Sequence, residues 1–305
     1  MIDEHVSEWL GLPVELYDPS KTPDYAGRIY RIATNWDQGM SFAEQFKKFT
    51  ANPACGATKG IVAGAFHGDD PGRGSEEVVQ LLVAARQLLP NLRGIFVGDV
   101  VGEENEISWI IQSEMTPLFE AYPALEHFRV RGSGGLGIGG GIRHAALQSL
   151  VFESGGLPAG LMGEIAASEV PALVDLEIWT GSDNYGGDST VADLRPFLDG
   201  SAWPWLRRLG LRDCEYADSL AEALIGAPML ARIQELDLSL GNLGDRGGEA
   251  LLKNPALVQL QKLDLHHHYF SEGMVKKLAQ KFPQADLSDA QGEADDDDRY
   301  IAVSE

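Results

Sequence analysis

The sequence is poor in basic residues for a chain of 305 residues. Only 24 lysines and arginines stand against 46 aspartates and glutamates, so the formal net charge is −22. Nucleic acid repels such a surface, and the composition therefore argues against a general DNA- or RNA-binding protein. The hydrophobic content of 44% and the charged content of 23% are ordinary for a globular domain.

Cysteine and long apolar runs are also scarce. The two cysteines, Cys55 and Cys214, are too few for a disulfide scaffold, which predicts a reducing compartment. The first residues, MIDEHVSEWLGLPVELYD, contain neither a basic stretch nor an apolar core, so we expect no signal peptide. No run of 18 apolar residues is present, so we expect no transmembrane helix and no membrane contact. These absences together predict a cytoplasmic protein.

The common catalytic motifs are missing as well. The chain has no G-x-S-x-G, no H-E-x-x-H, no Walker-type loop and no C-x-x-C pair. Carboxylates are abundant, but abundance alone does not define an acid–base pair. The sequence therefore predicts no catalytic residue and no cofactor.

One short apolar pattern recurs along the chain: leucine, two residues, leucine, one residue, leucine, with other apolar residues allowed. Its first positions lie at 92, 125, 147, 173, 206, 233, 260 and 282, which gives steps of 33, 22, 26, 33, 27, 27 and 22. Most of these steps fall in the range of about 20–29 residues that is typical of leucine-rich repeats. The two longer steps indicate small insertions.

Helical patterns alternate with these strand patterns. They lie at 76–89, 107–122, 160–170, 190–198, 218–227, 245–254 and 271–282, and a further helix is expected at 41–50, before the repeats. A strand that alternates with a helix at a short period implies parallel strands joined by right-handed crossovers. The predicted fold is therefore an α/β leucine-rich-repeat solenoid, a horseshoe with a parallel β-sheet on its concave face and helices on its convex face.

The ends of the chain lie outside the repeat. We expect residues 1–57 to cap the solenoid, residues 58–288 to form it, and residues 289–305 to form an acidic C-terminal tail that contains DDDD at 295–298. The last residues, RYIAVSE, are more apolar than a plain disordered tail. They favour a short strand or a peptide that a partner recognises.

The repeats resemble those of bacterial leucine-rich-repeat proteins, and most closely the ribonuclease-inhibitor-like branch. The most specific match is IQELDLSLGNLGDRGGEALL at 233–252, with leucines at the strand positions, then LGD, then an amphipathic helix. The resemblance covers roughly 90–290. It implies a fold and a style of binding, but no reaction.

Two features that suggest chemistry have structural interpretations. The stretch at 131–144 contains G-x-G-x-x-G at Gly135, Gly137 and Gly140, yet only IRHAA separates these glycines from the next strand pattern. A dinucleotide-binding loop must open a helix, and there is no room for one here, so we predict a tight turn. Cys214 stands ninth in its repeat, where such repeats place Asn or Cys to bond the backbone, so we predict a structural cysteine.

Three consecutive histidines, His266 to His268, end one repeat strand. His268 stands ninth in the repeat, so we expect it to point inward, whereas His266 stands seventh and shares a face with Asp264. Asp237 of the neighbouring strand is expected close by. Asp237, Asp264 and His266 are weak candidates for metal ligands, because the sequence shows no rigid three- or four-ligand arrangement. A solvated polar cluster is the favoured interpretation.

The concave face of the predicted sheet carries the third, fifth and seventh residues of each repeat. Its charge alternates between basic and acidic strands, and we expect Trp179 to be exposed between them. Tryptophan and arginine are frequent binding hot spots, and mixed charge gives specificity. The candidate partner-binding residues are Arg129, Arg131, Glu153, Asp175, Glu177, Trp179, Arg208, Arg212, Glu235, Asp237, Asp264 and His266.

Three functions remain open from the sequence. The favoured one is a non-catalytic interaction module that binds a partner protein or peptide on the concave face. The alternative is a metal-dependent enzyme or cation-binding protein with its site near Asp237, Asp264 and His266, or in the loop from Asp183 to Asp188. The third is a regulatory subunit whose acidic tail contacts the partner. The sequence leaves the oligomeric state open and is compatible with a monomer.

Overall fold

The computed structural model describes residues 2–35, 39–68, 70, 72–292, 295 and 298–303. The chain divides into two compact units, and each is described by itself. Unit 1 consists of residues 1–152 and 167–170, and unit 2 of residues 153–166 and 171–304. Within the described ranges, no helix is both long enough and apolar enough to cross a bilayer.

Unit 1 places its strands side by side in chain order, with short helices between them. Its strands are β1 (Glu8–Trp9), β2 (Leu12–Leu16), β3 (Ile29–Ile32), β4 (Gly60–Ala63), β5 (Gly94–Val97), β6 (His127–Arg131) and β7 (Ser149–Glu153). Its helices are α1 (Phe42–Thr50), α2 (Glu76–Ala84) and α3 (Thr116–Ala121), with 3-10 turns η1 (Pro53–Ala57) and η2 (Ile107–Trp109). Strand β1 is antiparallel to β2, and the pairs from β2–β3 to β5–β6 are parallel.

The N-terminal hairpin of unit 1 covers an apolar patch of its sheet. Trp9 and Leu10 of this hairpin pack against a buried cluster that includes Val62 and Phe96. Gly94 leaves the space for them, since a Cβ there would lie 2.7 Å from the Leu10 side chain and 2.8 Å from that of Trp9. The first residues of the chain therefore belong to the packed unit.

Unit 2 repeats the alternation of strand and helix. Its strands are β8 (Asp175–Gly181), β9 (Arg208–Cys214), β10 (Glu235–Asp237), β11 (Lys262–Asp264) and β12 (Ala285–Asp286). Its helices are α4 (Ala159–Ala166), α5 (Val191–Leu198), α6 (Ala217–Ala223), α7 (Asp245–Lys253) and α8 (Glu272–Lys281), with 3-10 turns η3 (Asp183–Tyr185), η4 (Pro228–Ala231) and η5 (Pro255–Gln259). All strand pairs from β8–β9 to β11–β12 are parallel.

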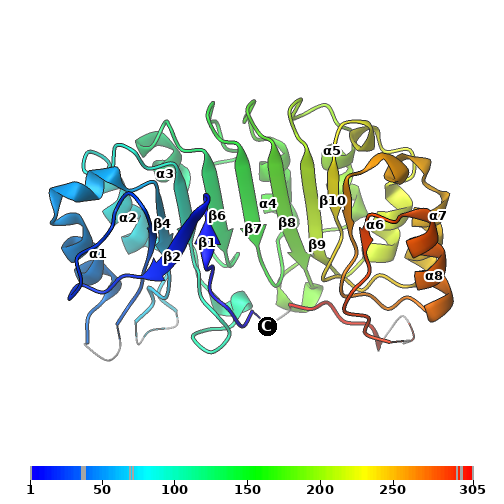
Figure 1. Cartoon of the computed structure of the whole chain (residues 1–305), viewed down its shortest axis with the longest axis horizontal. Helices are drawn as coiled ribbons and strands as arrows, with labels where there is room; N and C mark the ends of the chain where they lie inside the picture. Colours follow the sequence, from blue (N-terminus) through cyan, green and yellow to red (C-terminus); the bar gives the residue numbers. More distant parts are fainter. Residues whose placement is uncertain are drawn as a thin grey trace. The chain divides into compact units, whose positions relative to one another are not determined.

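The repeat leucines form the core of unit 2. Leu209, Leu236 and Leu263 lie in register on adjacent strands and are fully buried. Burial of each such side chain contributes about 1.5–3 kcal/mol relative to exposure. The helices α4 and α5 lie behind the strands in Figure 1 and cover this apolar side of the sheet. The predicted α/β leucine-rich-repeat solenoid is confirmed by this parallel, repeating arrangement.

Two local predictions had different outcomes. The helix at 41–50 is confirmed as α1, whose N-cap Ser41 forms a capping box with Glu44. The single helix predicted for 107–122 is wrong, since that stretch contains the turn η2 and the short helix α3. Pro117 lies in the first turn of α3. Because it has no N–H to donate, a helix can begin at this proline but cannot extend into it from the preceding residues.

Candidate functional site

The strands of unit 2 present a polar face opposite the buried leucines. Side chains of a strand alternate between its two faces, so every second residue belongs to this side. We call it the open face, and it consists of Asp175, Glu177, Trp179, Arg208, Gly210, Arg212, Glu235, Asp237, Ser239, Lys262, Asp264 and His266. The strand register places Glu177 and Asp237 on either side of Gly210, and the open face is organised around that position.

Two arginines of β9 converge on the carboxylates beside Gly210. Arg208 Nη2 lies 2.5 Å from Glu177 Oε2 and 3.0 Å from Asp237 Oδ2, and its Nη1 lies 2.9 Å from Asp175 Oδ1. Arg212 Nη1 lies 2.9 Å from Glu177 Oε1, and its Nε lies 3.4 Å from Asp237 Oδ2. The result is a connected network of ion pairs across three strands.

Gly210 makes room for this network. Because it has no side chain, the Glu177 side chain extends over the strand between the two arginines. A Cβ at position 210 would lie 3.1 Å from Glu177 Cγ, which is tighter than an ordinary van der Waals contact. The pattern Arg-x-Gly-x-Arg therefore places two guanidinium groups on one face of the strand. The glycine between them leaves space for a carboxylate side chain from the neighbouring strand.

The network changes the ionisation of its members. Burial alone would raise the pKa of Glu177, but Arg212 and Arg208 more than offset it and hold the pKa at about 2. Burial would lower the pKa of Arg208, but Glu177 and Asp175 raise it above its ordinary value. Glu177 is thus a fixed anion near neutral pH and is poorly suited to accept a proton in catalysis.

The expectation that Trp179 is exposed is wrong. Its side chain is only 6% exposed, because the Arg212 guanidinium lies over the ring at 5.0 Å from its centroid. The indole Nε1–H donates a 2.7 Å hydrogen bond to Glu177 Oε1. Trp179 therefore packs beneath the Arg212 guanidinium and hydrogen-bonds Glu177, while Arg208 and Arg212 remain partly accessible to solvent.

The other predicted partner-binding residues differ in accessibility. Asp175, Arg208, Arg212, Glu235 and His266 are partly exposed, as is Arg129 of unit 1, whose guanidinium lies over Phe96. The remaining candidates are buried, namely Arg131, Glu153, Glu177, Trp179, Asp237 and Asp264. These buried side chains present little surface to a partner, and their contact with one stays a prediction.

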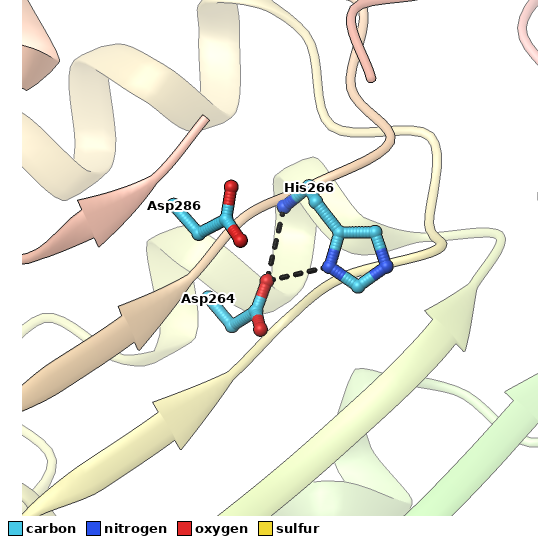
Figure 2. Close-up of side chains that lie close together, drawn as sticks. All are labelled: Asp264, His266 and Asp286. Atoms are coloured by element: carbon cyan, nitrogen blue, oxygen red, sulfur yellow. Dashed lines mark hydrogen bonds and ion pairs between the residues drawn. The ribbon is translucent and has the colours of Figure 1, made fainter. Parts of the chain in front are cut away.

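Asp237, Asp264 and His266 do not form a set of possible metal ligands, although Asp237 lies opposite Asp264 in the strand register. Asp237 belongs to the arginine network, whereas Asp264 and His266 lie beside Asp286 of β12 (Figure 2). One possible ligand atom from each of Asp264, His266 and Asp286 lies within 4.8 Å of the others. Sequence reasoning missed Asp286 because the last repeat is degenerate, although its register opposite Asp264 follows from that repeat.

The contacts of Asp264 favour an ion-pair cluster over a metal site. His266 Nδ1 lies 2.6 Å from Asp264 Oδ1, and Lys262 Nζ lies 2.9 Å from Asp264 Oδ2, so both oxygens are engaged. The hydrogen bond with Asp264 raises the pKa of His266, which favours the imidazolium form. A protonated imidazole cannot bind a metal ion, and Lys262 would repel one.

We therefore expect no cation binding tighter than about 1 mM at neutral pH, because Lys262 and His266 already engage both oxygens of the Asp264 carboxylate. Isothermal titration of the full chain with Zn²⁺, Mn²⁺ and Ca²⁺ measures this directly. Micromolar binding of any of them that disappears in His266→Ala would contradict this interpretation and restore the metal site.

Two other sequence interpretations concern buried side chains. Cys214 is buried, and desolvation raises the pKa of its thiol to about 12, so the thiolate of a nucleophile does not form near neutral pH. His268 is fully buried, as its repeat position predicts, and its Nδ1 accepts a hydrogen bond from the Phe270 N–H. The glycine-rich stretch contains no helix between β6 and β7, in agreement with a turn.

The comparisons with known proteins extend the description of the fold. No protein-family model matches the chain, and no curated protein matches its sequence. A Bacteroides fragilis protein of known crystal structure is similar at 26% identity and a TM-score of 0.82, over 92% of this chain and 78% of that one. An internalin from Listeria monocytogenes (13% identity, TM-score 0.40, 86% and 66% of the two chains) and a chain of the yeast Rad7–Elc1 complex (11%, 0.40, 87% and 69%) are more distant matches.

Proposed function

We propose that this chain is a non-catalytic interaction module that binds a partner protein or peptide on the open face of unit 2. The observation that carries the proposal is the network around Glu177. It holds Arg208 and Arg212 in one arrangement while leaving 27% and 17% of their side chains exposed. Side chains ordered before binding lose little conformational entropy in a complex, so they suit a binding surface.

The charge of the open face indicates the chemistry of the partner. It carries five carboxylates against Arg208, Arg212 and Lys262, which leaves a net charge of −2 before His266 is counted. A partner with lysine or arginine side chains complements this surface, and charge complementarity sets orientation and association rate. Glu235 is the partly exposed carboxylate between Arg208 and Lys262 in the strand register.

The same side chains argue against catalysis. A general acid or base needs a pKa near the working pH, but Glu177 is held at about 2, and Asp264 is held below its ordinary value by His266 and Lys262 despite its burial. We therefore propose no reaction for this face and no cofactor.

A charge reversal on the open face tests the proposal. We expect Glu235→Lys to weaken partner binding at least tenfold, because it replaces an attractive charge with a repulsive one at the interface. Glu249→Lys is the matched control, since Glu249 is 65% exposed on α7, on the helical side of unit 2. The partner is first isolated by affinity capture from the organism that encodes this protein, with the 305-residue chain as bait. Titration calorimetry then measures the affinity of each variant for the isolated partner.

The salt dependence adds a second measurement. Affinity for the wild type should fall as ionic strength rises, and Glu235→Lys should reduce that dependence. Equal affinities for Glu235→Lys and Glu249→Lys would move the binding surface away from the open face.

A further inference from the structure

The last described residues lie along unit 2 as an extended segment. We call Arg299–Val303 the tail segment. Ile301 and Val303 are buried, with 8% and 5% of these residues exposed, and only 7% of the Arg299 side chain is exposed. Tyr300, in contrast, is 70% exposed. This alternation is that of an extended peptide lying on a surface. The tail segment therefore uses every second side chain for contact, in the pattern Arg-x-Ile-x-Val.

The tail segment contacts the same position of three successive repeats. The contacted residues each stand eighth in a repeat: Asp213, Leu240 and His267. The Val303 N–H donates to Asp213 Oδ1 at 3.0 Å, and the Ala302 N–H donates to the Leu240 carbonyl at 2.8 Å. His267 Nε2 lies 3.4 Å from the Tyr300 carbonyl oxygen. The segment thus crosses the repeats in the order opposite to the chain. We call the crossed surface the ledge, formed by these three residues with Asp218, Asn242 and Tyr269.

The backbone of the ledge has an unusual conformation. Asp213, Leu240 and His267 have φ angles of 51°, 66° and 60°, in the left-handed region that residues other than glycine rarely adopt. Such conformations persist where the surrounding structure imposes them, and they often mark functional sites. Here they recur at one position in consecutive repeats, where the tail segment binds.

Arg299 has a specific site at one end of the ledge. Its Nη1 lies 3.1 Å from Asp218 Oδ2 and donates to the Asn242 carbonyl at 3.1 Å. Only 7% of each side chain of the Arg299–Asp218 pair is exposed. A Cβ on Gly244 would collide with the guanidinium, so the glycine leaves space for it. The site therefore selects a basic side chain.

The ledge does not depend on the tail segment for its shape. Asp218 Oδ1 accepts hydrogen bonds from the Gly244 and Gly247 N–H groups at 2.8 and 3.0 Å. Asn242 Nδ2 donates to the Glu215 carbonyl at 2.6 Å. These contacts lie within the repeats, so the surface stays in place when the tail segment leaves. A preformed surface can bind a second peptide without a cost of reorganisation.

We propose that the ledge is a peptide-binding site that the tail segment occupies in cis, and that it binds an extended peptide of a partner with the pattern Arg-x-aliphatic-x-aliphatic. Main-chain hydrogen bonds supply affinity for such a peptide, and the alternate side chains supply specificity. A tethered segment competes at an effective concentration of millimolar order, so a partner binds where its affinity exceeds that of the tail or where the tail is released. This site uses residues other than those of the open face and does not rest on the function proposed above.

The test uses the 305-residue chain as a double variant, Ile301→Asp with Val303→Asp. The two substitutions disfavour docking of the tail segment and leave the residues of the ledge unchanged. The probe is a fluorescein-labelled peptide, Arg-Tyr-Ile-Ala-Val-Ser-Glu, followed by fluorescence anisotropy. We expect this variant to bind the peptide with a Kd below about 1 mM, because weaker binding would leave the tail segment undocked in cis. The wild type should bind it at least tenfold more weakly.

A second pair of variants identifies the site. In the undocked background, Asp218→Asn should weaken peptide binding at least tenfold, whereas Asp245→Asn, an exposed aspartate that begins α7, should not change it. No peptide binding to the undocked variant, or equal binding to it and to the wild type, would overturn the proposal.

Hydrogen exchange of the wild type gives an independent measurement, whatever the stability of the variants. The Ala302 and Val303 amides should exchange at least tenfold faster than the Leu236 amide in β10, because the tail segment opens without unfolding the repeats. Equal protection would make the tail segment a fixed part of unit 2, and the proposal would fail.

Discussion

Replacing Glu177 with glutamine should lower the free energy of unfolding by about 3 kcal/mol, the size expected when one member of a buried ion pair is removed. The substitution keeps the shape of the side chain and the acceptor oxygen for the Trp179 indole, so it changes mainly the charge. Arg208 and Arg212 would then face each other across Gly210 with only Asp237 and the more exposed Asp175 to compensate them.

The pH dependence follows from the ionisation of Glu177. Its pKa is about 2 in the folded chain and near 4.5 in an unfolded one. A carboxyl group with a depressed pKa contributes stability that is fully present above the unfolded value and is lost as pH falls towards the folded value. The wild type should therefore lose stability between pH 4.5 and 2, and Glu177→Gln should lose less over the same interval.

Urea denaturation followed by tryptophan fluorescence measures both effects. Asp175→Asn is the control within the same network, because Asp175 is 31% exposed and its Oδ1 pairs with the partly exposed Arg208. Its cost should stay below about 1 kcal/mol, as for a surface pair. A loss for Glu177→Gln no larger than that of Asp175→Asn would show that the network contributes little to folding.

The network also shows what the sequence could and could not predict. Repeat spacing determines which residues share the open face, since leucine positions fix the strand register and alternate residues fix the side. The accessibility of a side chain depends on more than the side of the sheet on which it lies. The Glu177 side chain extends between Arg208 and Arg212 because residue 210 is a glycine, and Arg212 lies over the Trp179 ring. The face on which a side chain lies can thus be assigned from its own strand. Its accessibility depends also on the side chains of the neighbouring strands.

The histidine run illustrates the same limit. His268 was predicted inward from its repeat position, and it is buried. Asp264 and Asp237 were both expected beside His266. Asp264 does contact His266, but Asp237 pairs with arginine side chains of β9, and the degenerate last repeat adds Asp286 to the group. Local periodicity gives the direction of a side chain. Its ion-pair partner depends on which charged side chains of the adjacent strands lie close enough to compete for it. The apolar end of the acidic tail was recognised, but its docking on its own chain was not, because no local pattern specifies a contact about eighty residues away in sequence.

The largest effect outside the open face is expected at Asp218. Helix α7 begins after Gly244, which has no side chain to cap the helix, and the Asp218 carboxylate of the previous repeat accepts the N–H groups of Gly244 and Gly247 instead. Asp218→Ala removes this cap, worth about 1–2 kcal/mol, and takes the Asp218 carboxylate away from the buried Arg299 side chain. We expect a total loss of about 3 kcal/mol in the free energy of unfolding, measured by urea denaturation.

Two variants separate the contributions. Asp218→Asn keeps one carbonyl oxygen for the cap but loses the charge that faces Arg299, so it should cost less than Asp218→Ala and still accelerate tryptic cleavage after Arg299. Asp245→Ala removes the equivalent contact one repeat later, where the Asp245 carboxylate accepts from the Ser271 N–H at 2.8 Å and its hydroxyl at 2.7 Å. Because Asp245 is exposed and Ser271 caps α8 by itself, its loss should be well under half that of Asp218→Ala. Similar losses for the two alanine variants would mean that burial and the contact with Arg299 add nothing to the cap.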